Sequence, residues 1–421
     1  MKRITQTIMF LVVAAEVAFA TTPEVTITSA SQDDGSRRVR IDYRLDNAPG
    51  IVTLDVLTNG VSIGDANIQY VIGDANKIVD AGLHTIIWRP DKSWAGFHFT
   101  TPVVSFRLTA WATNAPPDYM ALNMLNWSVR YYTSTNALPG GFNDIAYKTD
   151  ILLMRRIPAG GQTFVEGSPA TESYRNADRE TPRNVSFSED YYIGVFEFTY
   201  AQFARIGWKY KWSDYNAVNY SSRSENGDIC PINSVSFGAL RGTTTGTQWP
   251  TVETIDGDSV LGYLRNKSGI DFDLPTDAQW EFACRAGTVG MLYNNATLTW
   301  DKADEIGWLY YPEAKRVTAP QEVGQKKPNS YGLYDMIGNV KELTRGRFYD
   351  SGNRKPGADV IDPKGIAGGS YWNCRGSSYS ETAADPCRAA ALTPAYNNGG
   401  SSQYGFRLVC PVGLKIAGVV Q

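Results

Sequence analysis

The chain has 421 residues, which is too long for one ordinary hydrophobic core and favours two or three domains. Its hydrophobic content of 43% and charged content of 20% are those of a folded globular protein and exclude an intrinsically disordered chain. The formal net charge is −3, and charges of both signs are mixed along the chain, so nothing favours nucleic acid or an anionic membrane surface as a partner.

The N-terminus, residues 1–20, has the pattern of a secretory signal peptide. It contains a charged start, an apolar run and a small-residue cleavage site, which are Lys2-Arg3, Ile8–Ala15 and Ala18-Phe19-Ala20. The apolar run is too short to span a bilayer, and so is the tail at residues 413–421. We therefore expect no membrane span and a mature protein that is secreted, periplasmic or on the cell surface. The alternative is an uncleaved N-terminal anchor.

Residues 21–114 are expected to form an all-β domain. Apolar and polar residues alternate in runs that begin at Val39, Val52 and Val104. Alternation with a period of two indicates antiparallel strands that cover a core on one side. Asn59-Gly60 is a signal for a hairpin turn. About seven short strands fit into this length, which favours an immunoglobulin-like sandwich.

The strand pattern ends at Ala115-Pro116-Pro117-Asp118, because two prolines cannot extend a β-ladder. Residues 115–148 are polar, aromatic and irregular, and we interpret them as a connector that packs on one of its neighbours. The composition changes again at about residue 149. From there to residue 412, glycine, asparagine and aromatic residues are scattered, and long regular elements are few.

Three short helices are expected in this last part. The first covers Tyr200–Ile206 and follows a strand at Tyr191–Thr199, and the second covers Ile255–Arg265. The third is marked at its start by a capping box of Thr276 and Gln279.

The stretch from Gly332 to Glu342 predicts a tightly wound loop. It contains two glycines, two carboxylates and an asparagine between apolar residues, which fits neither a helix nor a strand. Asp335 and Glu342 can turn their oxygens to a common point, with backbone carbonyls between them. Calcium needs such a set of oxygens on a chain that can bend. The alternative is a buried turn whose acids accept hydrogen bonds from backbone N–H groups.

Residues 149–412 contain no histidine, because both histidines, His84 and His98, lie in the N-terminal part, where we expect structural roles. A Ser-His-Asp or Cys-His nucleophile and a histidine-based iron site are therefore excluded from this part. No two cysteines have the Cys-x-x-Cys spacing of a zinc knuckle, and no phosphate-binding glycine loop is present. Thiol chemistry, carboxylate chemistry, calcium or binding alone remain.

Six stretches of this part, in order, resemble the formylglycine-generating enzyme family, also called sulfatase-modifying factors. They are Tyr192–Thr199, Pro231–Phe237, Leu274–Gly287, Pro328–Val340, Gly368-Gly369-Ser370-Tyr371 and Gly405–Leu408. The resemblance implies a C-type-lectin-like, mixed α+β domain with few regular elements over residues 149–412. The all-β domain before it lies outside the resemblance.

The resemblance also implies a calcium site in the loop that ends at Glu342. Members of the family bind calcium there through a side-chain amide or acid, two backbone carbonyls and a glutamate. The corresponding positions are Asp335, Gly338, Val340 and Glu342, and all four are kept. We therefore expect calcium as a cofactor.

Most of the catalytic residues of the family are not kept at the corresponding positions of this chain. Sulfatase-modifying members oxidise a substrate cysteine to formylglycine with molecular oxygen, and two cysteines hold Cu(I), which soft thiolates select. Cys374 comes three residues after Tyr371, one later than the family's first cysteine, and no cysteine stands near Tyr379, where the second is expected. Leu392 stands where the active members have an arginine. We therefore expect no copper.

Two further departures and five cysteines bear on the same question. Lys341 and Leu343 replace both tryptophans of the family's Val-Trp-Glu-Trp. The cysteines are Cys230, Cys284, Cys374, Cys387 and Cys410, an odd number that leaves at least one unpaired within a chain. The resemblance suggests a disulfide between Cys284 and Cys387, because some members join these two regions.

These observations favour a secreted, non-catalytic relative that binds a protein, peptide or glycan ligand outside the cytoplasm. The candidate binding residues are Ser370, Tyr371 and Arg407. The alternative is an oxidoreductase that acts on protein cysteine. It would use Cys374 as the catalytic thiol, with Cys387 or Cys410 brought near by the fold.

Overall fold

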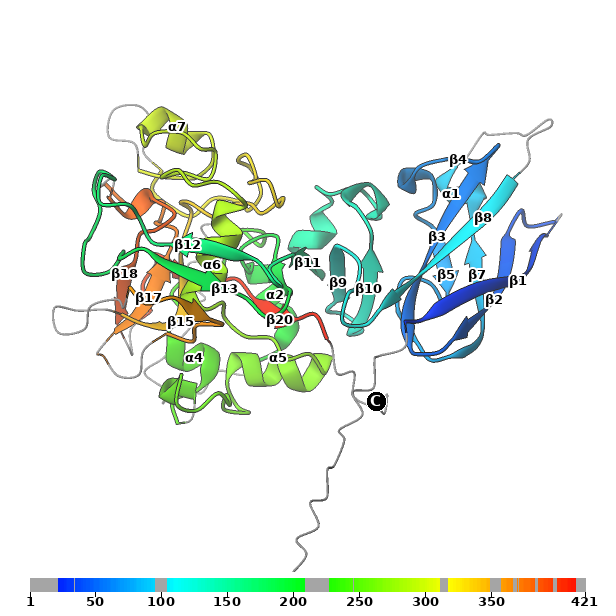
Figure 1. Ribbon diagram of the computed structural model, residues 1–421, viewed down its shortest axis with the longest axis horizontal. Coiled ribbons are helices and arrows are strands. Elements are labelled where there is room, and N and C mark those ends of the chain that lie inside the picture. Colours follow the sequence, from blue (N-terminus) through cyan, green and yellow to red (C-terminus); the bar gives the residue numbers. More distant parts are fainter. Residues whose placement is uncertain are drawn as a thin grey trace, which may run out of the picture.

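The computed structural model describes residues 22–413, apart from 34, 95–103, 209–226, 245, 311–316, 349–356, 366–368, 370, 383–384 and 397–399. The signal peptide expected at residues 1–20 and the tail after residue 413 lie outside the described residues, as does His98. Figure 1 shows an all-β part formed by the first strands and a larger mixed part formed by the rest of the chain.

The N-terminal part has two antiparallel sheets. The first has the order β1 (Glu24–Gln32), β2 (Val39–Asp46), β7 (Gly82–Trp88) and β5 (Val71–Gly73). In the second, β3 (Gly50–Thr58) pairs with β4 (Val61–Ser62), β6 (Ile78–Val79) and β8 (Val104–Ala112). The short helices are η1 (Asp65–Asn67) and α1 (Pro90–Ser93). Side chains from both sheets pack in one hydrophobic cluster.

The predicted alternation is confirmed in β2, where Ile41, Tyr43 and Leu45 are buried, Arg40 and Arg44 are exposed and Asp42 is half-buried. Asn59 and Gly60 both have positive φ angles, 51° and 80°, as a two-residue hairpin turn requires. The all-β character of this part is therefore confirmed, and its immunoglobulin-like topology stays a prediction.

The connector expected to be irregular contains two strands, β9 (Tyr119–Asn123) and β10 (Ser128–Tyr132). They form one edge of a five-stranded antiparallel sheet with the order β10-β9-β11-β14-β20, whose other members are β11 (Ile151–Ile157), β14 (Tyr191–Gly194) and β20 (Val409–Pro411). The strand β9 cannot be recognised from the sequence. Tyr119 to Leu122 are all buried, and a strand covered on both faces shows no alternation of apolar and polar residues. The short helices η2 (Thr135–Ala137) and η3 (Ile145–Lys148) follow.

The connector also contacts the N-terminal sheets. The N–H of Tyr131 donates to the carbonyl of Asn76 over 2.7 Å, and Nη1 of Arg130 donates to the carbonyl of Ala75 over 2.5 Å. Backbone and side-chain bonds thus join the two parts at β10, which lies between them in Figure 1.

Two smaller sheets complete the mixed part. One contains β12 (Thr163–Glu166), β13 (Arg183–Ser186) and β16 (Val360–Ile361). The other has the order β18 (Thr393–Tyr396), β17 (Tyr371–Arg375), β15 (Lys341–Arg347) and β19 (Tyr404–Gly405). Most pairs are antiparallel, but β13 with β16 and β15 with β19 are parallel.

The helices of the mixed part are short, and the α-helices begin at capping hydroxyl groups. They are α2 (Tyr200–Ile206), α4 (Phe237–Arg241), η5 (Gly246–Gln248), α5 (Val260–Ser268), α6 (Asp277–Arg285), α7 (Trp300–Asp304) and η6 (Asp385–Cys387). The bounds of α2 and the capping box of α6 are as predicted. Helix α5 begins later than the expected Ile255, because the hydroxyl of Ser259 caps it by accepting from the N–H of Gly262.

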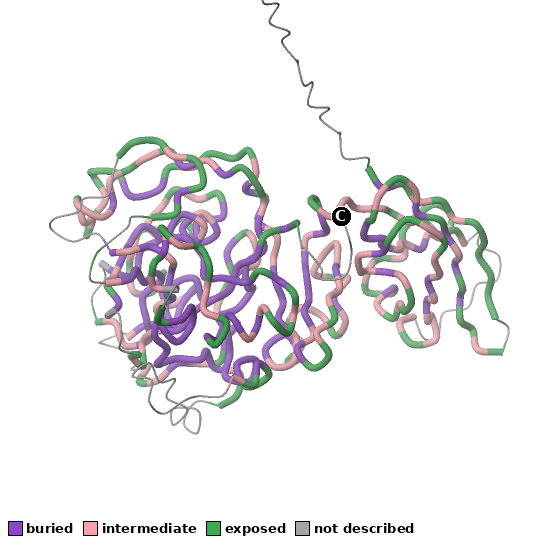
Figure 2. The backbone as a smooth tube through the Cα atoms, turned by 90° about the horizontal axis from the view of Figure 1, so that it is seen from below, coloured by how far each residue is buried: buried purple, intermediate pink, exposed green. Residues whose placement is uncertain are grey.

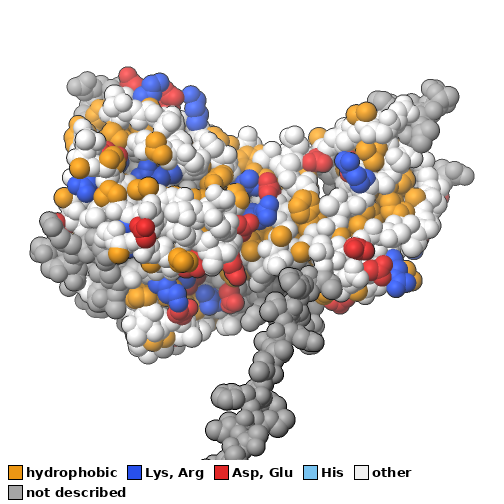
Figure 3. Space-filling model, viewed as in Figure 1, with side chains coloured by type: hydrophobic (Ala, Val, Ile, Leu, Met, Phe, Trp, Pro, Cys, Tyr) orange, Lys and Arg blue, Asp and Glu red, His pale blue; other side chains and the backbone are white. Residues whose placement is uncertain are grey.

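Burial is concentrated in the mixed part, as Figure 2 shows. Two large hydrophobic clusters lie there, one around the five-stranded sheet with α2, α4 and α5, the other around α6 and the loop before β15. The mixed α and β composition is confirmed, and its C-type-lectin-like topology stays a prediction. On the face seen in Figure 3, acidic and basic side chains are intermixed. Among the described residues, no helix is long and apolar enough to cross a membrane.

Candidate functional site

The predicted loop from Gly332 to Glu342 is confirmed, because no helix or strand is present until β15 begins at Lys341. Asp335, Gly338 and Asn339 have positive φ angles of 55°, 88° and 58°. A Cβ on Gly338 would lie 2.5 Å from the carbonyl oxygen of Trp308, so only glycine fits at this position. The backbone therefore winds tightly around a buried centre.

Asp335 lies in this centre and is 1% exposed. Its Oδ2 accepts from the N–H of Gly324 over 2.7 Å. Its Oδ1 is buried and has no hydrogen-bond donor among the described residues. Burial raises the pKa of Asp335 to about 6. The acid thus offers one unsatisfied oxygen in a place that water does not reach.

Glu342 is fully buried, and both of its carboxylate oxygens accept hydrogen bonds. Arg407 donates to both of its oxygens over 2.6 Å, from Nε and from Nη2, and Nε1 of Trp280 donates to Oε2 over 2.7 Å. The remaining donors of Arg407 meet the carbonyls of Gly194 and Tyr334. Arg407, a candidate binding residue, is therefore a buried structural residue that no external ligand reaches in this structure.

A third carboxylate, Glu197, completes the cluster and was missed by sequence reasoning. Its Oε1 accepts from the N–H of Val340 over 3.0 Å and its Oε2 from the amide of Asn339 over 2.6 Å. Burial and the negative charges of Asp335 and Glu342 raise its pKa well above the usual range. The one signal in the sequence was an acid inside the apolar run after β14.

The donor set of the loop fits calcium in part. Asp335 supplies a buried oxygen without a donor, whereas Glu342 already binds a guanidinium that calcium would have to share. Gly338 and Val340 donate their N–H groups to Gly376 and Glu197, and the calcium prediction concerns their carbonyls. In the described part of the chain, no group of three or more histidine, cysteine or acidic side chains is arranged to hold a metal ion.

Cys374 is the fourth of the five residues of β17 and is fully buried. It is opposite Leu343 of β15, and both side chains belong to a hydrophobic cluster that also contains Trp372. Burial raises the pKa of its thiol far above the usual range. A thiol of this kind is neither a thiolate nor accessible, so it lacks both properties of a reactive cysteine.

The neighbours of Cys374 are held in a buried polar network. The amide of Asn373 donates to Asp277 over 2.6 Å, and the hydroxyl of Thr344 donates to the other oxygen of the same carboxylate over 2.6 Å. Arg375, which is also fully buried, donates to Glu281 over 3.0 Å. Sequence reasoning missed this network, since its members are distant in the chain.

All five cysteines are described and buried, and none forms a disulfide in the structure. Cys284 and Cys387 pack in one hydrophobic cluster as separate thiols, so the expected disulfide between them is not shown. Cys374 and Cys410 belong to the other cluster. The Sγ of Cys387 lies 3.3 Å from the hydroxyl of Ser377. Of the two other candidate binding residues, Tyr371 is half-buried at the start of β17 and Ser370 lies outside the described residues.

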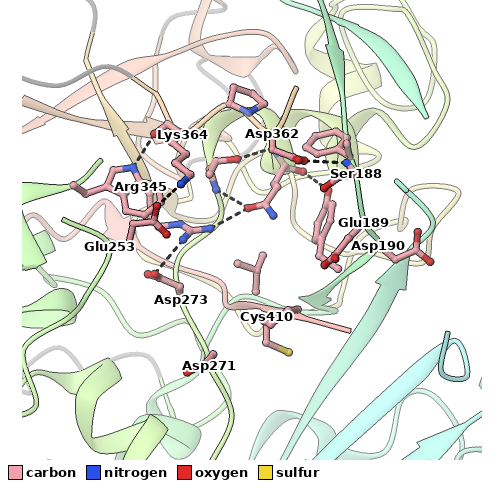
Figure 4. Close-up of a pocket in the computed structure, with 18 of the residues that line it drawn as sticks. Ser188, Glu189, Asp190, Glu253, Asp271, Asp273, Arg345, Asp362, Lys364 and Cys410 are labelled. Carbon is pink, nitrogen blue, oxygen red and sulfur yellow. Dashed lines mark hydrogen bonds and ion pairs between the residues drawn. The ribbon is translucent and has the colours of Figure 1, made fainter. Parts of the chain in front are cut away.

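A cleft of about 510 Å³ lies away from Cys374, Tyr371 and the loop at residues 332–342. Its walls come from the turn between β13 and β14, the segment around Trp249, helices α5 and α6, β15, β20 and the residues after β16. In Figure 4, Arg345 and Lys364 lie on one side of it with their partners Asp273 and Glu253, and Glu189 and Asp190 lie on the other. Sequence reasoning did not find this cleft.

Comparison with known proteins gives one family and several distant relatives. A model described as a sulfatase-modifying factor enzyme 1-like domain matches residues 151–412. The formylglycine-generating enzyme of Mycobacterium tuberculosis is 29% identical over 168 residues, which are 32% of this chain and 50% of that protein. The inactive C-alpha-formylglycine-generating enzyme 2 of Bos taurus is 33% identical over 86 residues, 18% of this chain and 27% of that protein.

Among solved structures, the Treponema denticola variable protein 1 is similar, with 21% identity and a TM-score of 0.46, over 62% of this chain and 95% of that one. The chain spans half of the Mycobacterium tuberculosis enzyme and about a quarter of the Bos taurus protein.

Proposed function

Because the chain belongs to the sulfatase-modifying factor enzyme 1-like family, we propose that it is a non-catalytic member that binds a protein, peptide or glycan ligand outside the cytoplasm. The observation that carries the proposal is the complete burial of Cys374 among apolar side chains. Copper(I) binding and nucleophilic attack both need a thiolate, and burial, which outweighs the positive charge of Lys341, disfavours that form.

The surroundings of Cys374 support the same proposal. Asn373 stands where the resemblance places the family's first cysteine, and its amide is engaged by Asp277. Tyr379, near the second expected position, is buried and carries no thiol. Copper would thus find one buried thiol in place of two, and the residues present do not fit it. The name of one relative, an inactive enzyme, fits a family with non-catalytic members.

The remaining features of the proposal come from the sequence. The signal peptide supports export, and the all-β part supports an immunoglobulin-like accessory domain beside a C-type-lectin-like one. Calcium is proposed to bind the loop at residues 332–342, with Asp335 as its side-chain ligand and the carbonyls of Gly338 and Val340 beside it. The buried Asp335 oxygen without a donor supports this proposal. Bound there, calcium would hold the loop in its wound form.

The test is an oxidation assay with a cysteine-containing sulfatase peptide, Cu(I) and oxygen, read by mass spectrometry as conversion of cysteine to formylglycine. The Mycobacterium tuberculosis enzyme serves as the positive control, and Cys374→Ser as the matched variant. We expect no product from the wild type or the variant and no tight binding of copper. Product that disappears in Cys374→Ser would overturn the proposal and establish the oxidoreductase alternative.

A further inference from the structure

Of the residues discussed for catalysis or calcium, only Cys410 lines the cleft of about 510 Å³. Cys374, Tyr371 and the loop at residues 332–342 do not line this cleft. Its volume suits a ligand of a few residues or sugar units. The character of the ligand must follow from the charges and rings of the walls.

One end of the cleft has an excess of guanidinium groups. Three arginines share the carboxylate of Asp273, with Nε of Arg241 at 3.0 Å, Nη1 of Arg345 at 3.1 Å and Nη2 of Arg265 at 3.4 Å. Asp273 is nearly buried, and Lys364 pairs with Glu253 on the same side, as Figure 4 shows. A second carboxylate, Asp271, lies 3.8 Å from Nη1 of Arg265. Two carboxylates do not neutralise three guanidinium groups, so this end favours an anionic group.

Two observations agree with an excess of positive charge at this end. Burial lowers the pKa of Arg241, and the positive charges of Arg345 and Arg265 contribute to the shift. The Nε of Arg345 is buried and has no hydrogen-bond partner among the described residues. A carboxylate from a ligand would relieve the repulsion between the three guanidinium groups.

The opposite end of the cleft is acidic. Glu189, Asp190 and Asp362 lie there, and Figure 4 places them across the cleft from Arg345. Asp190 is held by Arg156 at 3.4 Å, but neither Glu189 nor Asp362 has an ion-pair partner among the described residues. Asp362 accepts only the N–H of Ser188, over 3.0 Å. This end therefore favours a cationic group.

The aromatic rings of the cleft do not offer a platform for a sugar. Trp249 is 4% exposed, and the guanidinium groups of Arg241 and Arg345 lie over its ring at 5.1 Å and 4.6 Å from the centroid. Phe187 and Tyr191 are also buried. Between the charged ends the wall is apolar, formed by Val409, Cys410 and Pro411 of β20. Charge and not ring stacking is thus the means of recognition.

We propose that this cleft binds a short peptide whose carboxylate meets the arginine end and whose amino group or basic side chain meets the acidic end. The inference rests on the proposed binding function and names the ligand class for it. A glycan is one of the ligands that the sequence analysis allowed. A neutral glycan would form no charge-assisted contact at either end of the cleft.

The experiment measures binding of the tripeptide Lys-Val-Glu, with free termini, to the full mature chain by saturation-transfer NMR and calorimetry. Three probes act as controls: the same peptide with blocked termini, the uncharged peptide acetyl-Ala-Val-Ala-amide, and the neutral trisaccharide chitotriose. We expect the free tripeptide to bind most tightly, the uncharged peptide and trisaccharide not to bind, and affinity to fall as salt is raised.

Two variants test the acidic end and the arginine end of the cleft separately. Glu189→Gln removes an exposed acid without breaking an ion pair, and Arg345→Gln removes a cation of the other end. Each should weaken binding about tenfold or more, because a charge-assisted contact is lost. Lys302→Gln, an exposed lysine of α7 away from the cleft, is the matched control and should bind like the wild type. Circular dichroism checks that the Arg345 variant is folded.

The proposal is overturned if the free tripeptide does not bind, if chitotriose binds more tightly, or if Glu189→Gln leaves the affinity unchanged. Any of these results with no formylglycine product would leave the proposed non-catalytic function intact and remove only the peptide cleft. Formylglycine product would remove the proposed function whatever the peptide result.

Discussion

The carboxylate of Glu342 and the guanidinium of Arg407 form a fully buried ion pair in which each carboxylate oxygen accepts one N–H over 2.6 Å. The pair joins the start of β15 to the segment that leads into β20. It lies at the end of the loop for which the sequence predicts calcium. The same glutamate is therefore both the expected metal ligand and half of a structural ion pair.

We expect Glu342→Gln to destabilise the protein by about 3–5 kcal/mol, because the variant leaves the charge of Arg407 buried without its partner. Urea unfolding of the metal-free protein measures the change. Glu305→Gln, which removes a half-buried surface partner of the exposed Lys302 and Lys327, is the control and should have little effect. Equal midpoints for the two variants would contradict the structural role of the buried pair.

Calcium should raise the melting temperature of the wild type relative to a chelator. A ligand at a hundred times its dissociation constant stabilises the folded state by about 2.7 kcal/mol. In Asp335→Asn the rise should be lost or reduced, because the buried oxygen loses its charge. Asp301→Asn, on the surface of α7, should respond like the wild type. Identical melting of the wild type in calcium and in chelator would refute the calcium site.

The five cysteine thiols should not react with a thiol reagent in the native protein. All five are buried, and burial raises the pKa values of Cys284 and Cys374. After unfolding without a reductant, five thiols per chain should react. Three would reveal a disulfide, and peptide mapping would show whether it joins Cys284 to Cys387. Rapid reaction of Cys374 in the folded protein would count against the non-catalytic proposal.

A second buried ion pair should make stability depend on pH. Burial alone would raise the pKa of Glu180, but hydrogen bonds and the charge of Arg388 outweigh it, so the pKa is lowered. The pair therefore stabilises the fold above the unfolded-state pKa of about 4.3 and is lost as the pH falls through the lower folded-state value. The difference in unfolding free energy between wild type and Glu180→Gln should shrink below that pH. A constant difference from pH 3 to pH 7 would disprove this.

The connector strands should be required for the mixed part to fold. A chain that begins at residue 115 keeps β9 and β10, whereas one that begins at residue 150 loses both and exposes β11. We expect the first to unfold cooperatively and the second to aggregate, because Leu152 and Met154 would become exposed on an unpaired edge. Soluble, cooperative unfolding of the shorter chain would show that the two strands are dispensable.

The sequence predicted the elements whose signals are local. These are the bounds of α2, the capping box of α6, the Asn59-Gly60 hairpin and the wound loop at Asp335, which all depend on residues close to one another in the chain. The strand β9 was missed because burial on both faces removes alternation. The family was predicted from motifs that keep their order along the chain.

The candidate site could be predicted only in part, for a physical reason. Asp335 and Glu342 are close in the sequence, so their shared loop was visible. Arg407, which binds Glu342, and Glu197, which binds the loop backbone, come from other parts of the fold. The arginines around Asp273 are likewise separated in the chain, and their positions follow from packing that no local pattern records.

The central sheet also constrains the order in which the molecule can form. Strand β20, close to the end of the described chain, pairs with β14, and Asp273 meets Val409 in a further backbone bridge. Because a ribosome releases the chain from its N-terminus, the N-terminal sheets can close early, whereas the larger part must wait for its last strand. Contacts so distant in sequence close slowly. The newly made chain thus holds four strands of an unfinished sheet until β20 has been made, and in that interval it depends most on protection from aggregation.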